Sequence, residues 1–249
     1  MSSSLRLNKF LARAGVCSRR KADELIARGA VRVNHEPVRQ MGIMVDPGRD
    51  VVTVEHKVIT LMPSADTTYL ILNKPPGVVT TVHDPEKRRT VMDFVPNDHK
   101  NKRLVPVGRL DFFSQGLLLL TNDGPLVHRM THPSWKQPKV YQVTVREKPS
   151  RKALDIVAAG MTLACGQKLA PVQARIIRSQ DQAWVLEMVL YQGINRQIRR
   201  MCQDLGLTIL KLVRSAQGPL SLGNLPEGKT RELSPAEVRS LKKSSGMAD

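Results

Sequence analysis

The sequence predicts an α+β protein that consists of a small N-terminal module and a larger domain with a mixed, largely antiparallel sheet. The chain has 249 residues, of which 41% are hydrophobic, and this is enough to fill more than one core. A polar, proline-led stretch at residues 63–68 is typical of a linker. Beyond it, apolar runs and helical patterns alternate without the regular rhythm that parallel sheets require. We therefore expect a module at residues 1–62, a linker at 63–68, a larger domain at 69–241 and a flexible tail at 242–249.

The N-terminal module is expected to contain two short helices followed by strands. Apolar residues recur at helical spacing over residues 5–14, which predicts a first amphipathic helix. Ser18 can cap a second helix that ends at Gly29. Valine-rich runs at residues 31–33 and 51–58 are typical of strands and complete the module.

The two predicted helices carry many positive charges. Lys and Arg number 39 in the whole chain against 22 Asp and Glu, so the formal net charge is +17 and a polyanionic partner is favoured. These charges could simply be solvated helix faces, but only Asp23 and Glu24 accompany them in this stretch. We therefore expect an RNA-binding surface that contacts phosphates. The basic residues of the stretch are Arg6, Lys9, Arg13, Arg19, Arg20, Lys21, Arg28 and Arg32.

The larger domain is expected to mix strands and helices. Four apolar runs predict strands, two segments with helical periodicity predict helices, and Ser234 with Glu237 forms a capping box for a last helix that runs toward Leu241. The predicted strands cover residues 69–72, 117–120, 140–145 and 184–190, and the predicted helices cover residues 150–159 and 196–205.

Several classes of protein are disfavoured. The longest apolar run, Leu117–Leu120, is far shorter than the roughly 20 residues of a transmembrane helix, and the polar start has no signal-peptide core. We therefore expect a cytoplasmic protein that does not contact the membrane. The three cysteines are an odd number without close spacing, which suggests neither disulfides nor a zinc site. His128 and His132 are four residues apart but have no further ligands nearby in the sequence, so no metal is expected.

One nucleotide-binding motif occurs by coincidence. Residues 223–230 read GNLPEGKT, which matches the phosphate-binding loop G-x-x-x-x-G-K-T. That loop requires a helix that begins at the Lys-Thr pair, whereas the next predicted helix begins at Ser234 and Pro226 stiffens the loop. We do not expect a nucleotide triphosphate to bind here.

Candidate catalytic residues occur in three segments. Asp111, with Arg109 close by, lies just before a glycine and a four-leucine strand, so a packed core is expected to hold this carboxylate rigidly. Tyr141 heads an alternating strand and could stack on a base, although core packing would also explain it. A glycine turn at residue 193 opens a helix that carries Arg196, Arg199 and Arg200, and these could grip phosphates. One of the three could instead neutralise Asp111 and favour its ionised form.

Together these segments resemble the RsuA-type pseudouridine synthases, and residues 6–34 resemble the S4 RNA-binding domain that precedes the catalytic domain in that family. The matching motifs read KPPG at residues 74–77, GRLDFFSQGLLLLT at 108–121, KVY at 139–141 and GINRQIRRM at 193–201. The resemblance is strongest to the RluF-like branch, which acts on 23S ribosomal RNA. Most members have Glu-Gly where this chain has Gln192-Gly193, which bears on the target and hardly on the chemistry.

The resemblance implies a role for each residue of the candidate site. It makes Asp111 the catalytic aspartate, Tyr141 the ring that packs on the target uracil, and Arg199 the basic partner of Asp111. Arg109 would enter the RNA stack where the uridine has left. Arg196 and Arg200 would contact RNA, as would Arg6, Lys9, Arg13, Arg19, Arg20 and Lys21.

The implied reaction converts a uridine to pseudouridine after the base has flipped out of the RNA. It gains and loses no atom, so no cofactor is expected. Asp111 could attack C1′ or remove the 2′ proton, and the sequence does not choose between these routes. The expected partner is 23S rRNA or a large-subunit precursor, with tRNA a further option, and a monomer is expected. The main alternative is a non-catalytic RNA-binding or ribosome-assembly factor. A metal-dependent nuclease is a weaker one, because the domain has no cluster of carboxylates.

Overall fold

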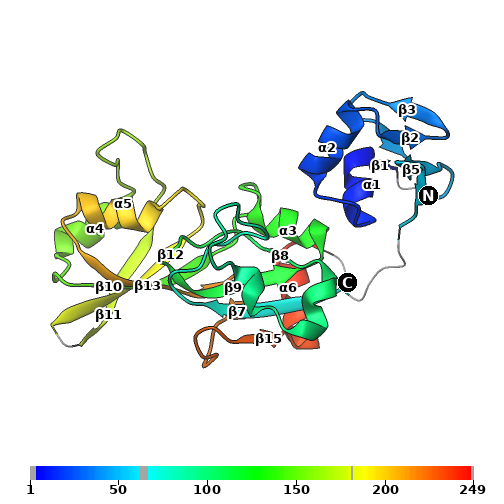
Figure 1. The fold of residues 1–249 in the computed structure, drawn as a ribbon. Helices are drawn as coiled ribbons and strands as arrows, with labels where there is room; N and C mark the ends of the chain where they lie inside the picture. The colour runs from blue at the N-terminus through cyan, green and yellow to red at the C-terminus, as the bar shows by residue number, and fades with distance from the viewer. Residues whose placement is uncertain (1–3, 62–66, 181, 248–249) are drawn as a thin grey trace. The chain divides into compact units, whose positions relative to one another are not determined.

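The protein folds into two compact units, Met1–Asp66 and Thr67–Asp249 (Figure 1). The structure is a computed structural model that describes residues 4–61, 67–180 and 182–247. Residues 63–66 of the predicted linker lie outside the described residues. Thr68, predicted to be in the linker, is instead buried and belongs to the second unit, where its carbonyl oxygen accepts a hydrogen bond from Thr121 Oγ1 at 2.7 Å.

The first unit packs two helices against a small antiparallel sheet. Ser18 caps the second helix as predicted, since its hydroxyl accepts a hydrogen bond from the backbone N–H of Lys21 at 3.2 Å. Apolar side chains of both helices, among them Leu7, Phe10 and Ile26, form one core with valines of the strands. The helices are α1 (Leu7–Arg13) and α2 (Arg19–Ala27), and the strands are β1 (Leu5–Arg6), β2 (Val31–Val33), β3 (Glu36–Val38), β4 (Met44–Val45), β5 (Val52–Val54) and β6 (Lys57–Ile59).

Two predictions for this unit need correction. The first helix begins two residues later than expected, because Leu5 and Arg6 pair with β4 instead. The run at residues 51–58 is not one strand but the hairpin of β5 and β6. The chain turns at Glu55 and His56, which have positive φ angles of 47° and 68°. Valine content alone does not reveal such a turn, because it contains neither glycine nor proline.

The second unit is built on a nine-stranded sheet in the order β11-β12-β10-β13-β9-β7-β15, with β14 paired to β13 and β8 paired to β9. All its pairs are antiparallel except β13 with β9, which confirms the predicted mixed, largely antiparallel sheet. The strands are β7 (Tyr69–Lys74), β8 (Val105–Pro106), β9 (Gln115–Thr121), β10 (Lys139–Val145), β11 (Gln173–Gln180), β12 (Ala183–Leu190), β13 (Ile209–Gln217), β14 (Leu220–Ser221) and β15 (Thr230–Glu232).

Strand β9 is buried on both faces, and this explains its four consecutive leucines. Side chains alternate along a strand, so Leu117 and Leu119 enter one core while Leu118 and Leu120 enter another. The first of these cores also receives Leu126 of α3 (Gly124–Thr131) and Leu241 of α6 (Pro235–Ser244). The segment that begins at Asp111 leads directly into this strand. The strand anchors that segment, because a shift of β9 along its own axis would disturb the packing of both cores.

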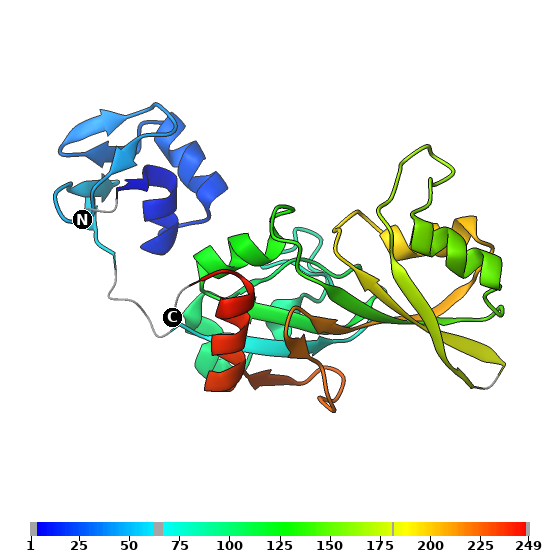
Figure 2. The same cartoon turned by 180° about the vertical axis from the view of Figure 1, so that it is seen from behind.

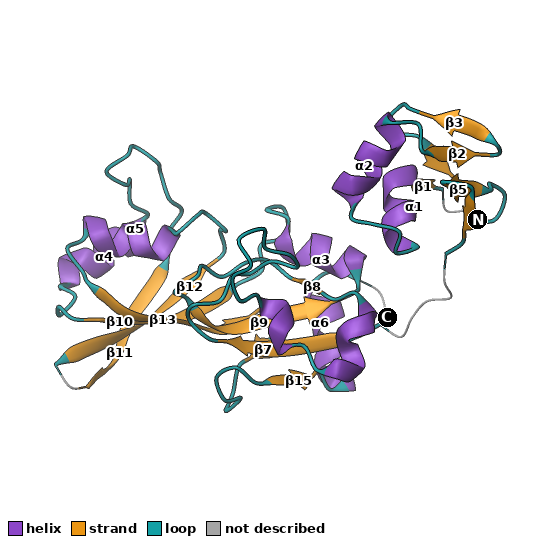
Figure 3. Ribbon diagram, viewed as in Figure 1, coloured by secondary structure: helices purple, strands orange, loops and turns teal. Residues whose placement is uncertain are grey.

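Helices cover the sheet on several sides. The helices α4 and α5 lie together over one part of the sheet (Figure 3), where their apolar residues share a core with β10 and β12. Seen from behind in Figure 2, α6 crosses the other part of the sheet. The helices are α3 (Gly124–Thr131), α4 (Arg151–Ala159), α5 (Gln197–Asp204) and α6 (Pro235–Ser244), with 3-10 helices η1 (Val91–Phe94) and η2 (Asn97–Lys102). None of the helices in the described ranges has the length and apolar character needed to cross a membrane.

The predicted flexible tail at residues 242–249 is wrong as far as the structure describes it. Helix α6 continues to Ser244, and Ser245 is fully buried. Arg129 Nη1 donates to the carbonyl oxygen of Ser245 at 2.9 Å, and Gln137 Nε2 donates to that of Ser244 at 2.7 Å. The two donors come from far earlier in the chain, so the charged sequence of the tail gives no sign of them.

The motif at residues 223–230 forms a loop that leads into a strand, as expected. Thr230 begins β15, so no helix follows the Lys-Thr pair. The backbone N–H of Gly228 donates to the carbonyl oxygen of Asn73 at 2.8 Å, and Asn73 N–H donates to that of Lys229 at 3.0 Å. The backbone of this loop therefore closes the edge of the sheet beside β7.

Replacing Glu237 by glutamine should destabilise the second unit more at neutral pH than in acid. Hydrogen bonds from Arg231, at 2.7 and 2.9 Å, and from the Ser234 backbone lower the pKa of Glu237 to about 2. Because this pKa lies below that of the unfolded chain, the stabilisation is complete above about pH 4.5 and is lost as the pH falls toward 2. We expect the free energy of unfolding to drop by about 1–3 kcal/mol at pH 7.

Urea unfolding followed by circular dichroism at pH 7 and at pH 3 measures this effect. The matched control is Asp155→Asn, which removes the exposed ion pair with Arg151 at 3.1 Å. An exposed pair contributes little, so less than about 0.5 kcal/mol should be lost. Equal losses for Glu237→Gln at the two pH values would contradict the prediction.

Candidate active site

Asp111 lies on a β-turn between β8 and β9. The turn is closed by a hydrogen bond of 3.0 Å from the backbone N–H of Ser114 to the carbonyl oxygen of Asp111. On its other side, Thr80 Oγ1 donates to the carbonyl oxygen of Leu110 at 2.7 Å, and the Leu110 side chain is buried in the core. The Asp111 side chain remains 34% exposed. The structure thus holds the backbone on both sides of a carboxylate that solvent can still reach.

Lys74 is the centre of the hydrogen bonds that hold this turn. Its fully buried ammonium lies near four carbonyl oxygens: that of Pro75 at 2.9 Å, those of Asp111 and Phe112 at 3.3 Å, and that of Ser114 at 2.9 Å. Burial lowers the pKa of Lys74 to about 8, and the Asp111 charge opposes that shift. Lys74 is therefore an ammonium at neutral pH. Sequence analysis placed Lys74 in a motif but assigned it no role. The only feature that pointed to its burial was its position at the end of an apolar strand.

The structure brings Arg199 to Asp111, as the resemblance implied. Arg199 Nε lies 3.8 Å from Asp111 Oδ2, and Arg199 Nη2 donates to Ser114 Oγ at 3.1 Å. Burial lowers the pKa of the Arg199 guanidinium, and the Asp111 carboxylate opposes that shift. Helix α5 fixes the arginine because its apolar residues Ile198, Met201 and Cys202 are buried in the core. One cation therefore contacts both ends of the Asp111 turn.

Tyr141 lies on β10, where it is half-buried between two cores. It packs against the core beneath α4 and α5 and also against the core that contains Leu110. Its neighbours across the sheet are Met188 on β12 and Arg214 on β13. The ring therefore packs against the core that also holds the residue before Asp111, and core packing and a role in the site are compatible.

Arg214 is a buried cation that sequence reasoning missed. It is 1% exposed, and its Nε donates to the carbonyl oxygen of Leu117 at 2.8 Å. Its backbone lies so close to Gly116 that a Cβ there would be 2.3 Å from the Arg214 carbonyl oxygen. Arg214 also lowers the pKa of Lys139, after burial as the larger cause. A single arginine in an alternating strand gives no sign of this burial.

The other predicted RNA-contacting residues take varied positions. Arg109 and Arg196 are exposed, and Arg196 is near enough to lower the pKa of Arg199. Arg200 instead bonds to Gln167 Oε1 and Cys165 Sγ, both at 2.8 Å. Gln192, which replaces the usual glutamate, accepts a hydrogen bond from the Ala170 backbone at 3.1 Å. In the first unit, exposed positions are taken by Arg6, Lys9, Arg13, Arg19, Arg20 and Lys21.

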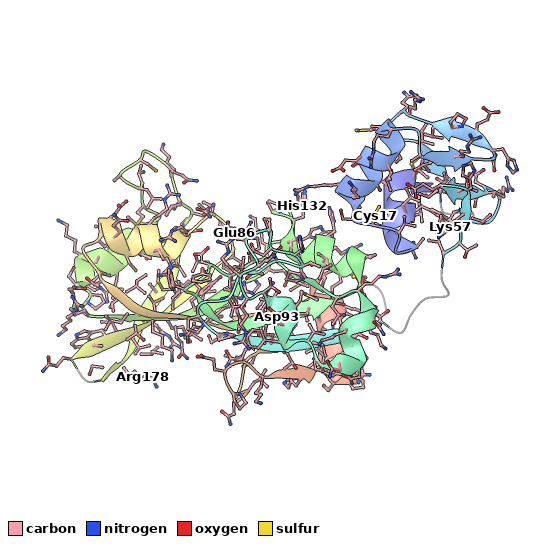
Figure 4. All side chains as sticks on the ribbon, viewed as in Figure 1. Cys17, Lys57, Glu86, Asp93, His132 and Arg178 are labelled. Carbon is pink, nitrogen blue, oxygen red and sulfur yellow. The ribbon has the colours of Figure 1, made fainter. Side chains whose placement is uncertain are left out.

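His128 and His132, four residues apart in the sequence, contact each other through their rings. The rings of His128 and His132 stack at the end of α3, with centroids 5.0 Å apart, and Figure 4 labels His132. Over the ranges that the structure describes, no group of three or more His, Cys, Asp and Glu side chains is placed to hold a metal ion.

Comparisons with known proteins identify relatives for both units of the chain. The family model described as RNA pseudouridylate synthase matches residues 68–204, and the S4 domain model matches residues 5–51. The ribosomal large subunit pseudouridine synthase B of Bacillus subtilis is 37% identical over 95% of both chains. The dual-specificity RNA pseudouridine synthase RluF of Escherichia coli K12 is 38% identical over 96% of this chain and 79% of its own. A crystal structure of a pseudouridylate synthase is 29% identical, with a TM-score of 0.68 over 96% of this chain and all of the other.

The family model spans the motifs that contain Asp111, Tyr141 and Arg199, and the relatives match nearly the whole chain. The S4 match covers the two basic helices of the first unit. The chain therefore belongs to the RNA pseudouridylate synthase family, as a member with an N-terminal S4 domain.

Proposed function

We propose that this enzyme isomerises a uridine of 23S ribosomal RNA, or of its large-subunit precursor, with Asp111 as the catalytic carboxylate. The observation that carries the proposal is the placement of Asp111 on a braced turn, 3.8 Å from the guanidinium of Arg199, whose side chain is only 20% exposed. Two relatives with about 37–38% identity carry names that refer to the large ribosomal subunit or to RluF, which supports rRNA as the substrate. We further propose that it acts as a monomer in the cytoplasm.

The reaction breaks the bond from N1 to C1′, turns the uracil and joins C5 to C1′. N1 gains the proton that C5 loses, so the product has the composition of the substrate. Asp111 acts as an anion, whether it attacks C1′ or removes the 2′ proton. Arg199 favours that anion and, through Ser114, fixes the far end of its turn.

Tyr141 and Arg109 compensate for the free-energy cost of moving the uracil out of its stack. Flipping a nucleotide out of its stack costs a few kcal/mol. The half-buried Tyr141 ring stacks on the extruded uracil, and the exposed Arg109 fills the space that the uracil leaves in the RNA. The 2′-hydroxyl at the reacting sugar makes RNA, and not DNA, the substrate.

Mapping of pseudouridines in rRNA tests the proposed substrate. Ribosomal RNA and tRNA are taken from cells that have the gene, from cells that lack it, and from deletion cells complemented with the Asp111→Asn variant. The pseudouridines of these RNAs are then compared position by position. We expect one or a few 23S positions to lose pseudouridine in the deletion and to stay unmodified with the variant. Loss confined to tRNA would contradict the rRNA target, and full modification with Asp111→Asn would support the alternative of a non-catalytic RNA-binding factor.

The exposed cations of the first unit should contribute to the salt dependence of RNA binding. Arg19 and Arg20 open α2, and in the described part of the chain neither belongs to an ion pair. Each phosphate contact contributes about 0.7–0.9 to the slope of log K against log salt. The double variant Arg19→Gln/Arg20→Gln should therefore reduce that slope by about 1.4–1.8.

Fluorescence anisotropy with labelled rRNA over a range of KCl concentrations measures the slope. The matched control is Lys57→Gln, which removes a cation from β6 of the same unit, labelled in Figure 4. The control should leave the slope within error of the wild type. An unchanged slope in the double variant would mean that α2 does not contact phosphates.

A further inference from the structure

The turn that holds Asp111 exposes two aromatic side chains at its tip. Phe112 and Phe113 occupy the central positions of the Asp111–Ser114 turn and are 39% and 67% exposed. Their rings meet edge to face, with centroids 4.9 Å apart and an interplanar angle of 83°. Turn tips normally carry Gly, Pro, Asn, Asp or Ser, so two adjacent phenylalanines require another explanation.

Three other rings of this unit lie beneath cations, whereas no cation covers the phenylalanine pair or the exposed Tyr191 within the described residues. Phe94, Trp135 and Trp184 each lie beneath a Lys or Arg side chain at 4.3–5.0 Å. Within the described residues, the only ring contact of Phe113 is with Phe112. The exposed part of Phe113 is therefore covered by no other ring and by no cation of the described residues.

The pair is held on a rigid base. The carbonyl oxygen of Phe112 accepts hydrogen bonds from Gly77 N–H at 2.8 Å and from Lys74 Nζ at 3.3 Å. The same ammonium holds the carbonyl oxygens of Asp111 and Ser114 at the two ends of the turn. Because the base is fixed, little conformational freedom is lost when a ligand contacts the rings.

We propose that Phe112 and Phe113 form a stacking platform for an unpaired RNA base next to the target uridine. RNA, and not a protein, is the occupant because the substrate must reach Asp111, which is two residues from Phe113. The two Cα atoms are at most about 7.6 Å apart, and stacked nucleotides rise about 3.4 Å each. The platform therefore reaches a base within about two nucleotides of the flipped one. Aromatic rings are a common means of holding unstacked RNA bases.

The platform would make the structure of the target RNA part of its recognition. Stacking tolerates any base but requires that the base be unpaired, since a paired base has both faces covered in the helix. The inferred preference is therefore for a uridine beside a bulged or looped nucleotide. This inference rests on the proposed catalytic role of Asp111, and it adds a positioning role for Phe113.

Four substitutions at Phe113 or at a control position test the platform. We compare Phe113→Ala, Phe113→Leu and Phe113→Tyr with the wild type in single-turnover reactions on unmodified 23S rRNA transcript, at increasing excess of enzyme. Loss of one stacked base weakens binding by roughly 5- to 150-fold. We expect the half-saturating enzyme concentration to rise by that factor for alanine, and the maximal rate to change by less than about threefold. The matched control, Leu210→Ala, truncates a side chain of β13 that is 52% exposed and should resemble the wild type.

The leucine and tyrosine variants separate stacking from simple apolar contact. Tyrosine should restore the wild-type concentration dependence to within about threefold, and leucine should resemble alanine. A leucine variant equal to the wild type would overturn the stacking role. So would an alanine variant with an unchanged half-saturating concentration, or one whose only defect is in the maximal rate.

A binding measurement distinguishes this inference from the proposed substrate. The same proteins are titrated against a fluorescein-labelled single-stranded RNA of mixed sequence, because stacking does not depend on sequence. A wild type that binds this RNA but leaves the 23S transcript unmodified contradicts the proposed target only. Equal dissociation constants for the wild type and Phe113→Ala contradict the platform, whatever the transcript result.

Discussion

Replacing Asp111 by asparagine is expected to abolish pseudouridine formation, with a loss of at least about a thousandfold in the single-turnover rate. Asparagine keeps the size of the side chain and much of its hydrogen-bonding capacity but removes the charge. The backbone contacts of the turn, from Ser114 N–H and Lys74 Nζ, do not involve the carboxylate. The fold and the RNA affinity should therefore remain within a few-fold of the wild type. A normal rate for this variant would overturn the catalytic assignment.

Arg199 should behave as one functional unit with Asp111. Arg199→Ala removes the cation 3.8 Å from the carboxylate and the hydrogen bond to Ser114, so turnover should fall sharply. If both residues serve the same step, Asp111→Asn/Arg199→Ala should be little worse than Asp111→Asn alone. Additive losses would instead indicate that Arg199 acts independently of Asp111.

The matched control for Arg199→Ala is Arg175→Gln. It also removes one arginine of the second unit, but from β11, where Arg175 bonds to Glu187 at 2.6 Å with 74% of its side chain exposed. Turnover at saturating enzyme should remain close to that of the wild type. A comparable loss in this control would show that net charge, and not the position of Arg199, limits the reaction.

Replacing Gly116 by alanine should have the largest effect on stability. Gly116 has a φ of +103°, and a Cβ would lie 2.3 Å from the carbonyl oxygen and 2.7 Å from the nitrogen of Arg214. Neither atom can rotate away, because both belong to the backbone of β13. Left-handed strain of about 1–2 kcal/mol and overpacking of about 1–3 kcal/mol together predict a loss of about 2–5 kcal/mol in the free energy of unfolding. That is a large share of the stability of an ordinary domain.

Urea unfolding of Gly116→Ala and Gly223→Ala separates the two contributions. Gly223 also has a positive φ, +57°, but no atom lies within 4 Å of its added Cβ. Gly223→Ala should therefore lose about 1–2 kcal/mol, from backbone strain alone. If the two variants lost equal stability, the close approach of β13 to Gly116 would not contribute.

Local patterns predicted much of the fold. Apolar runs located β7, β9, β10 and β12, and the hydroxyl of Ser18 marked the start of α2, because these elements depend on residues close in sequence. Apolar periodicity did not locate β13 or its place beside β9. Its parallel pairing, at Val213 with Gln115 and Arg214 with Gly116, joins segments about a hundred residues apart. No local pattern contains that information.

The candidate site, like the fold, was predicted only in part from the sequence. The motifs around Asp111 and Arg199 predicted an ion pair, and the structure places the two side chains 3.8 Å apart. The role of Lys74 could not be read from the sequence, because its partners are backbone carbonyl oxygens and any residue supplies one. Burial of Arg214 depends likewise on its strand lying between two others in the sheet.

The contact between Gly116 and β13 has a consequence for synthesis of the chain. The S4 unit, which ends before residue 67, leaves the ribosome first and can fold while the rest is still being made. The Asp111 turn emerges next, but the arginine it faces and the strand packed against it are both added much later. Until those later segments have been added, the nascent polypeptide can bind RNA through its S4 unit but has no assembled catalytic centre. Premature termination between the end of the S4 unit and β13 would therefore yield a product that competes for RNA and leaves every uridine unchanged.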